Sequence, residues 1–255
     1  MSTSIEFEKD GYQLSLAQNA DDLRDAQRLR YDVFITELGG QGPGVDHAAR
    51  IEQDAFDAVS DHLILRDNST DEVIGVYRVL RSDQVCSDVG FYSNSEYDLG
   101  PLVASGRNLL ELGRSCVHHA HRNGPAMFHL WTGLARYIQR HKCEILFGVA
   151  SLQGTEISEH AAALSLLHHR HRAPDELCPR AKTYQPMGLI PEAQLDRRAA
   201  MVAIPPLIKA YLRLGGVVGD GAFVDTAFNC TDVCMIMDTA QINKRQTRRF
   251  APELA

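Results

Sequence analysis

Apolar and polar residues follow two different periods in the first forty positions of the chain. Alternation between residues 12 and 16 predicts an opening strand. From Ala20 onward, apolar residues recur three and four positions apart, which predicts an amphipathic helix that ends near the glycines at 39–40. Aspartates at 21–22 suit the positive N-terminal end of that helix. The chain therefore opens with a strand followed by a helix.

The middle of the chain repeats this alternation of strands and helices. Two strands are predicted at 62–65 and 73–80, on either side of a polar turn. A strand at 109–117 is followed by a helix that starts near Pro125 and ends near residue 141, and then by an apolar strand at 145–149. This strand–helix–strand unit is typical of a mixed α/β sheet.

The last third of the sequence is less regular. A helix is predicted at 161–171, and an irregular excursion rich in proline and charge spans about 173–204. Two prolines then begin a helix at 207–214, and final strands are expected at 223–225 and 232–237. We expect residues 91–106, before the central strand, to be irregular.

Length and composition narrow the class of protein. The chain has 255 residues, of which 44% are hydrophobic and 23% charged, as in ordinary globular proteins. We expect one domain over residues 1–242 and a basic, flexible tail at 243–255. A formal net charge of -7 argues against a general nucleic-acid binder. No apolar run is as long as a membrane span, and no signal-peptide pattern begins the chain, so we expect a cytoplasmic location with reduced cysteines.

The strand at 109–117 carries the most informative chemistry. Glu111 and Arg114 stand among apolar residues. A buried carboxylate costs too much free energy unless it is paired or used, and desolvation raises its pKa toward that of a general base. Strand alternation places Glu111, Gly113 and Ser115 on one face and Arg114 on the other, unless a bulge intervenes. The alternative is that Glu111 pairs with Arg114 or Arg78 inside the sheet.

Other charged residues also require partners. Arg78 lies in the middle of a predicted strand, so we expect it to pair with Asp54 or Asp57. His62 is interpreted either as a hydrogen-bonded structural residue or as a base, and the first is the more common role of a single histidine. No glycine-rich nucleotide-binding motif is present.

Seven segments in fixed order make the pattern recognisable. They are Arg30-Tyr31-Asp32-Val33-Phe34, Asp54-Ala55-Phe56-Asp57, Asp61-His62-Leu63-Ile64, Gly75-Val76-Tyr77-Arg78, the strand from Glu111 to Val117, the helix from Pro206 to Gly215, and Gly219-Asp220-Gly221-Ala222. Over residues 12–238 the sequence resembles the L-ornithine N-alpha-acyltransferases. These are GNAT-fold acyltransferases, sometimes labelled hemolysin-like. A more distant similarity connects it to the acyl-homoserine lactone synthases.

The resemblance implies both a fold and a reaction. The fold would be a GNAT-like acyl-CoA N-acyltransferase domain, a mostly antiparallel mixed sheet flanked by helices. The enzyme would transfer a 3-hydroxyacyl chain from acyl carrier protein to the α-amine of L-ornithine, giving lyso-ornithine lipid. No tightly bound cofactor is implied, because the phosphopantetheine thioester is a co-substrate.

The resemblance also implies roles for individual residues. Glu111 would be the catalytic base, and Arg114 would hold the ornithine carboxylate. The substrate-binding set would be Arg30, Phe34, Asp54, Asp57, His62 and Arg78, although the preferred interpretation of Phe34 is a core residue. The acyl and phosphopantetheine groove would involve Ser115, Cys116, Val117, Arg122 and Gly124, where Pro125 removes an amide donor and so favours a carrier-protein thioester over acetyl-CoA.

Several alternatives remain open. Cys116 with His118 is a candidate nucleophile pair, and Tyr137 and Tyr211 are candidate acids for the departing thiolate. The histidine runs at 118–121 and 168–171 lack a known zinc spacing, so we expect no metal. Other candidate functions are an N-acyl amino acid or acyl-homoserine lactone synthase and, from another class, a non-enzymatic hemolysin-like membrane-active protein.

The expected partners follow from charge. An acyl carrier protein is acidic, so its docking patch should be basic. The basic tail at 244–249 suggests peripheral contact with anionic lipid at the inner membrane. The candidate docking patch comprises Arg136, Arg140, Lys142, Arg170 and Arg172.

Overall fold

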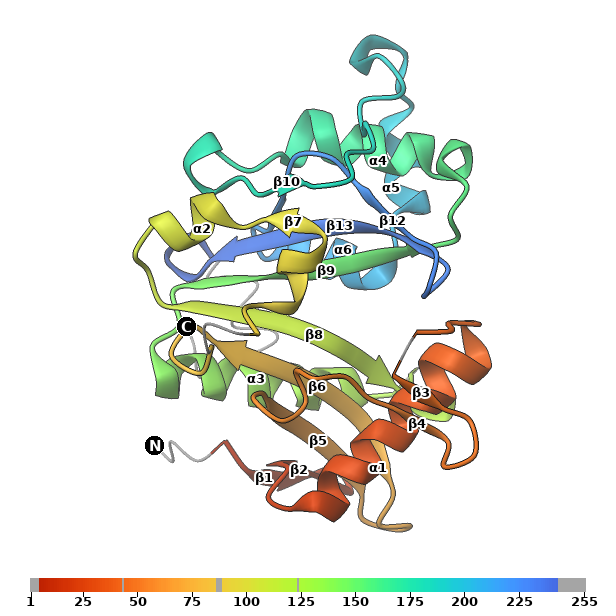
Figure 1. The fold of residues 1–255 in the computed structure, drawn as a ribbon, viewed down its shortest axis with the longest axis vertical. Helices are drawn as coiled ribbons and strands as arrows, with labels where there is room; N and C mark the ends of the chain where they lie inside the picture. Colours follow the sequence, from red (N-terminus) through yellow and green to blue (C-terminus); the bar gives the residue numbers. More distant parts are fainter. Residues whose placement is uncertain (1–4, 43, 86–88, 123, 243–255) are drawn as a thin grey trace. The chain divides into compact units, whose positions relative to one another are not determined.

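The computed structural model describes residues 5–42, 44–85, 89–122 and 124–242 (Figure 1). The chain divides into two compact units. The first unit comprises residues 1–89, 112–143 and 244–255, and the second comprises 90–111 and 144–243. Strand β8 (Leu109–Val117) begins in the second unit and ends in the first.

The first unit is built on antiparallel strands. β1 pairs with β2, β2 with β5, and β5 with β6, and β8 follows β6 in the order of strands. Leu63 of β5 lies opposite Tyr77 of β6, and both side chains are fully buried. The strands are β1 (Phe7–Lys9), β2 (Tyr12–Leu16), β5 (Asp61–Asp67) and β6 (Val73–Arg81).

Helices α1 (Ala20–Arg30) and α3 (Ala126–His141) cover opposite faces of these strands (Figure 1). Successive residues of β6 show why, since side chains alternate across a strand. Gly75 lies against Leu130 of α3, whereas Val76 packs with Ala26 and Leu29 of α1. A Cβ on Gly75 would lie 2.9 Å from Leu130 Cδ1, so the absence of a side chain at Gly75 allows α3 to pack closely against β6.

The helix predicted to run from Ala20 to the glycines at 39–40 has two parts. Asn19 caps α1 by accepting the amides of Asp21 and Asp22, at 2.9 and 3.0 Å. After Arg30 the chain continues as a π-helix, η1 (Tyr31–Glu37), which the 3.6-residue period did not predict. Two short strands, β3 (Val45–Asp46) and β4 (Ile51–Glu52), form a hairpin that the sequence pattern also missed.

In the second unit, the start of β8 pairs in parallel with β9 (Ile145–Gln153), placing Glu111 opposite Phe147. Parallel neighbours need a long crossover, and α3 supplies it, as the predicted strand–helix–strand unit requires. β9 pairs antiparallel with β13, which also pairs with β11 and β12. These strands are β11 (Val217–Val218), β12 (Phe223–Asp225) and β13 (Cys230–Asp238).

The remaining helices are α2 (Gly100–Ala104), α4 (Ile157–His171), α5 (Arg197–Ala203) and α6 (Pro206–Arg213). α4 begins before the predicted residue 161 because the side chain of Glu156 caps it by accepting the amide of Ser158. The short 3-10 helices are η2 (Tyr92–Ser95), η3 (His119–His121), η4 (Asp175–Leu177), η5 (Glu192–Gln194) and η6 (Thr239–Gln241).

Two segments expected to be irregular are ordered by long-range pairing. β7 (Tyr97–Asp98), within the segment 91–106, pairs with β10 (Arg180–Ala181), within the excursion at 173–204. Each strand has two residues, too few to show a period. The predicted mixed α/β class is confirmed, because the strands pair both antiparallel and parallel and are accompanied by helices. The basic tail at 243–255 lies outside the described residues.

No helix among the described residues is both long and apolar enough to cross a membrane.

Candidate active site

Glu111 is buried in β8, with an exposed fraction of 5%. Its two carboxylate oxygens accept hydrogen bonds from two successive backbone amides. Tyr92 N–H donates to Oε2 at 2.8 Å, and Ser93 N–H donates to Oε1 at 2.6 Å. These amides begin the 3-10 helix η2. Because amide donors stabilise the charged form of a carboxylate, they offset part of the cost of burying Glu111.

We call Glu111 and the two amides of Tyr92 and Ser93 the amide nest. Contacts within the second unit hold it in place. The Phe91 ring, just before η2, meets the Phe147 ring edge-on at 5.0 Å, and Phe147 lies opposite Glu111 in the β8–β9 register. The nest fixes the position of Glu111 without adding a positive side chain at those two contacts.

A second buried polar group lies wholly in the first unit. We call it the charge cluster: Arg30, Glu52, Asp54, Asp57, Arg78 and Arg114. Arg30 at the end of α1 is fully buried, with its Nε 2.6 Å from Glu52 Oε2 and its Nη2 2.7 Å from Asp57 Oδ2. Arg30 also donates to the Glu52 carbonyl oxygen at 2.6 Å. Desolvation disfavours the charge of Arg30, but its carboxylate partners raise its pKa.

Arg78 and Arg114 complete the cluster. Arg78 donates to Asp57 Oδ1 at 2.8 Å and to Asp54. Arg114 donates to Glu52 Oε1 at 3.1 Å and to Asp54 Oδ2 at 3.0 Å. Three guanidinium groups thus meet three carboxylates, and their formal charges cancel. The cluster ties β4 and the turn after it to α1, β6 and β8.

Asp57 accepts hydrogen bonds from both Arg30 and Arg78 in this cluster. Burial opposes its ionisation, but hydrogen bonds from Arg30, together with the charges of Arg30 and Arg78, outweigh burial and hold the pKa of Asp57 well below its usual range. Gln27 also donates to its Oδ2 at 3.0 Å. This carboxylate is already neutralised, so the expected substrate-binding role of Asp57 would require it to exchange partners.

The position of Arg114 depends on a break in strand alternation. Arg114 has φ 49°, in the left-handed region that residues other than glycine seldom adopt. This backbone conformation is typical of a β-bulge, and it ends the regular two-residue period on which Glu111, Gly113 and Ser115 were placed on one face. This left-handed residue lies in β8 at the place where the sequence interpretation left a bulge open.

His62 and Phe34 differ in their surroundings. His62 Nε2 lies 3.1 Å from the Asp57 carbonyl oxygen, and burial lowers the pKa of His62, which favours the neutral ring. Because a carbonyl only accepts, Nε2 is the protonated nitrogen in this contact. Phe34 packs against an apolar group that includes Leu29, Val33 and Cys116. Phe34 therefore contributes to the core of the first unit.

Cys116 belongs to that same apolar core. Burial raises the pKa of its thiol to about 12, so a reactive thiolate is disfavoured. Among the described residues, no histidine hydrogen-bonds to Cys116, and burial lowers the pKa of His118. The surroundings of Cys116 thus give no support to the alternative of a Cys116–His118 nucleophile pair.

The turn between β8 and α3 contains the other expected groove residues. Both terminal nitrogens of Arg122 contact the Glu37 carboxylate, and its Nε donates to the Val117 carbonyl oxygen at 2.9 Å. The Gly124 amide donates to the His121 carbonyl oxygen at 3.3 Å. The Ser115 hydroxyl is buried and has no hydrogen-bond partner within the described parts of the chain.

The proposed thiolate acid and docking patch have mixed surroundings. The Tyr137 hydroxyl donates to Asp61 Oδ2 at 2.6 Å, and burial together with that carboxylate raises the pKa of Tyr137. Arg136 stacks over the Phe7 ring at 4.5 Å, whereas Arg140 and Lys142 are exposed. In the second unit, Arg170 pairs with Glu192 and Arg172 with Asp175, and Tyr211 is buried.

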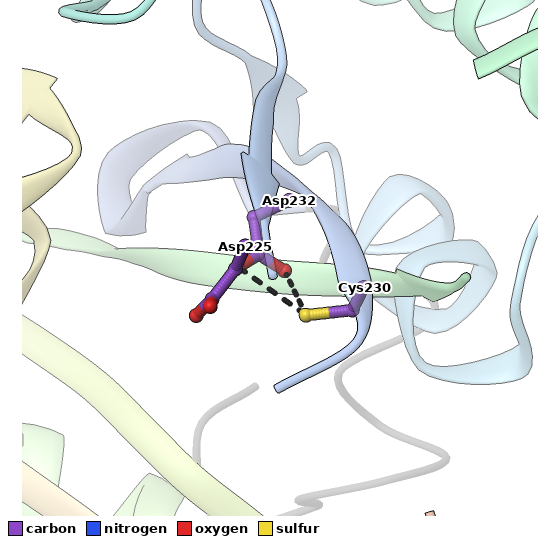
Figure 2. A group of neighbouring side chains, drawn as sticks. All are labelled: Asp225, Cys230 and Asp232. Carbon is purple, nitrogen blue, oxygen red and sulfur yellow. Dashed lines mark hydrogen bonds between the residues drawn. The ribbon is translucent and has the colours of Figure 1, made fainter. Parts of the chain in front are cut away.

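A further cluster was not anticipated from the sequence. Figure 2 shows Asp225 of β12 with Cys230 and Asp232 of β13, and their candidate ligand atoms lie within 4.8 Å of one another. The Cys230 thiol donates to Asp232, at 3.4 and 3.6 Å from its two oxygens, and burial with the Asp232 charge raises the pKa of that thiol. Asp225 Oδ1 accepts the amides of Ala227 and Phe228. Hydrogen bonds therefore explain the cluster: the Cys230 thiol donates to Asp232, and the Asp225 carboxylate accepts backbone amides.

Comparisons with known proteins agree with this architecture. A family model described as an acetyltransferase (GNAT) domain matches residues 29–132. The FeeM structure, an N-acyl amino acid synthase from uncultured soil microbes, has a TM-score of 0.54 at 12% identity, over 92% of this chain and 97% of that one. BjaI, a CoA-dependent acyl-homoserine lactone synthase, also has a TM-score of 0.54 at 14% identity, over 96% and 90% of the two chains. These likenesses confirm the expected fold.

Sequence identity is far higher with one group of relatives. An L-ornithine N(alpha)-acyltransferase from Rhodobacter capsulatus is 54% identical over 239 residues, which cover 92% of each chain. This identity extends over nearly the whole length of both chains. Together with the acyltransferase fold, it confirms the resemblance that the ordered sequence segments indicated. The chain belongs to the L-ornithine N(alpha)-acyltransferase family.

Proposed function

We propose that this enzyme transfers a 3-hydroxyacyl chain from acyl carrier protein to the α-amine of L-ornithine, forming lyso-ornithine lipid. The relative at 54% identity carries the name of the ornithine reaction. The observation that supports the chemistry in this chain is the buried Glu111 carboxylate, which two backbone amides hold in place. A base of this kind is what an ammonium substrate requires.

The reaction needs the substrate amine to lose protons. The α-ammonium of ornithine is protonated at neutral pH, and only the neutral amine attacks a thioester. Glu111 takes the first proton, the nitrogen attacks the thioester carbon, and a C–N bond forms. The C–S bond then breaks as the nitrogen loses its second proton. One proton ends on the departing thiol and the other returns from Glu111 to solvent.

The charge cluster plays a different part in this proposal. Arg114, with 11% of its side chain exposed, holds the ornithine carboxylate. A guanidinium has five N–H donors in a fixed fork, so it can contact more than one carboxylate. Arg30 and Arg78, which are at most 4% exposed, keep Arg114 and its acidic partners in place.

Donor binding is proposed to use the turn between β8 and α3. Arg122 is 39% exposed on its side chain, and it would contact the phosphate of phosphopantetheine by exchanging the Glu37 carboxylate that its two terminal nitrogens now hold. The exposed bases Arg140 and Lys142 supply attraction for the acidic carrier protein. The tail at 243–255 is proposed to contact anionic lipid, and flotation with anionic vesicles tests that part separately.

An acceptor panel tests the proposal directly. The full chain is incubated with 3-hydroxyacyl carrier protein and, in parallel, with the matching acyl-CoA, and products are read by mass spectrometry. Ornithine should be acylated, whereas N-alpha-acetylornithine, whose α-amine is blocked, should give no product. The ornithine methyl ester should react poorly because it lacks the carboxylate that Arg114 holds. Preferred acylation of homoserine derivatives, or of amino acids without a side-chain amine, would refute the ornithine assignment.

A further inference from the structure

The hydroxyl of Ser93 is a buried polar group with no assigned role. Ser93 is 1% exposed, and its Oγ has no hydrogen-bond partner within the described residues. An unsatisfied buried hydroxyl destabilises the fold, and most such groups in proteins find a partner. Its presence therefore calls for a partner from outside the described part of the chain.

Ser95 on the same 3-10 helix provides a contrast. Its Oγ donates to the Tyr92 carbonyl oxygen at 2.7 Å, and its side chain is exposed. A serine hydroxyl in η2 can thus bond to the local backbone, which is the common outcome for serine in turns. Ser93, which is shielded from solvent, makes no such bond.

The position of Ser93 relative to Glu111 suggests the missing partner. The Ser93 backbone nitrogen lies 2.6 Å from Glu111 Oε1, and only Cα and Cβ separate that nitrogen from Oγ. The hydroxyl oxygen is therefore three covalent bonds away from the nitrogen that contacts the carboxylate. Both residues belong to the second unit, so this neighbourhood is fixed within one compact body.

We propose that the Ser93 hydroxyl is a further substrate-contacting group, which hydrogen-bonds to the acceptor amine that Glu111 deprotonates. This inference rests on the proposed function. The hydroxyl oxygen accepts an N–H of the ammonium while a second N–H points to Glu111. After Glu111 has taken that proton, the bond to Ser93 keeps the nitrogen in place, with its lone pair available to the thioester carbon.

The proton balance is unchanged by this contact. Ser93 neither gains nor loses a proton, because its hydroxyl acts as an acceptor throughout. The nitrogen loses one proton to Glu111 and a second as the C–S bond breaks. The hydroxyl thus orients the amine, and its loss should affect the acceptor more than the acyl donor.

Ser93→Ala tests the inference while leaving the backbone amide on Glu111. We expect kcat/KM for ornithine to fall about 10-fold or more, because one orienting hydrogen bond is lost. KM for the acyl donor, and the slow hydrolysis of the donor without ornithine, should stay unchanged. The melting temperature should hold or rise, since an unsatisfied buried hydroxyl is removed. Ser95→Ala is the matched control and should retain wild-type kcat/KM.

Two outcomes overturn the inference. One is wild-type kcat/KM for ornithine in Ser93→Ala. The other is a fall in melting temperature with equal losses for donor hydrolysis and amine transfer, which would indicate a structural role. Should Ser93→Ala fail to fold, Ser93→Cys, which nearly preserves side-chain volume but bonds weakly, should show the same acceptor-specific loss, and wild-type activity there overturns the inference.

The same assay separates this inference from the proposed function. If wild-type protein acylates a different amine and not ornithine, the proposed substrate is wrong. Ser93→Ala is then compared with wild type on the amine that does react, and an acceptor-specific loss still supports the role of Ser93. Wild-type protein that acylates no amine would overturn both.

Discussion

The charge cluster and the amide nest bury carboxylates of the same type in opposite ways. In the charge cluster, Glu52, Asp54 and Asp57 face three guanidinium groups, so formal charge cancels. In the amide nest, Glu111 accepts hydrogen bonds from two backbone amides. Guanidinium groups and amide donors both favour the charged form of a carboxylate, but only the guanidinium groups bring a neutralising cation to the contact. We therefore expect cluster variants to change stability and nest variants to change turnover.

The largest effect should follow from Arg30→Met. This change removes a fully buried guanidinium and leaves the Glu52 and Asp57 carboxylates without their shared partner. Breaking a buried ion pair from one side costs about 3–5 kcal/mol. Urea unfolding should show that loss in the free energy of unfolding. A loss below about 1 kcal/mol would mean that the cluster carries little of the stability of the first unit.

Glu111→Gln should separate turnover from stability. The amide side chain has nearly the same shape and keeps one oxygen for the nest, but it cannot take a proton at neutral pH. We expect kcat for ornithine acylation to fall by about 100-fold or more, the range for loss of a general base. The urea midpoint should move much less than in Arg30→Met. An unchanged kcat in a folded variant would remove Glu111 from its proposed role.

Acid should weaken the charge cluster through Asp57. Its pKa is lowered in the folded protein, so its contribution to stability is complete above the unfolded value of about 3.9 and declines as pH falls below that value. The free energy of unfolding should fall by roughly 1–3 kcal/mol as the pH is lowered from above about 3.9 into the acid range where Asp57 becomes protonated. Urea titrations at several pH values measure it. Arg30→Met should flatten the dependence, because Arg30 is the main partner that lowers this pKa.

The sequence went far in predicting the fold because the signals were local and repeated. Period-two and helical patterns located β2, α1, β6, α3 and β9, and the strand–helix–strand order required a parallel crossover. Arg78 in a mid-strand position required an acidic partner, and it contacts both aspartates considered for it. The same signals could not resolve two-residue strands such as β7 and β10.

The site itself depended on features that leave no sequence pattern. The left-handed backbone of Arg114 is imposed on a residue type that does not favour it. The donors to Glu111 are backbone amides of a segment expected to be irregular, and every residue except proline has such an amide. The hydroxyl of Ser93 is notable only because none of the residues that the structure describes gives it a hydrogen-bond partner.

The sequence alone determined the family, the order of elements and the need for a buried acid on the central strand, because hydrophobic period and residue type are properties of the chain itself. Tertiary structure alone decided which carboxylates meet guanidinium groups and which meets amides, because those partners come from residues distant in sequence. That choice of partner separates the acids that stabilise this protein from the acid proposed to carry its chemistry.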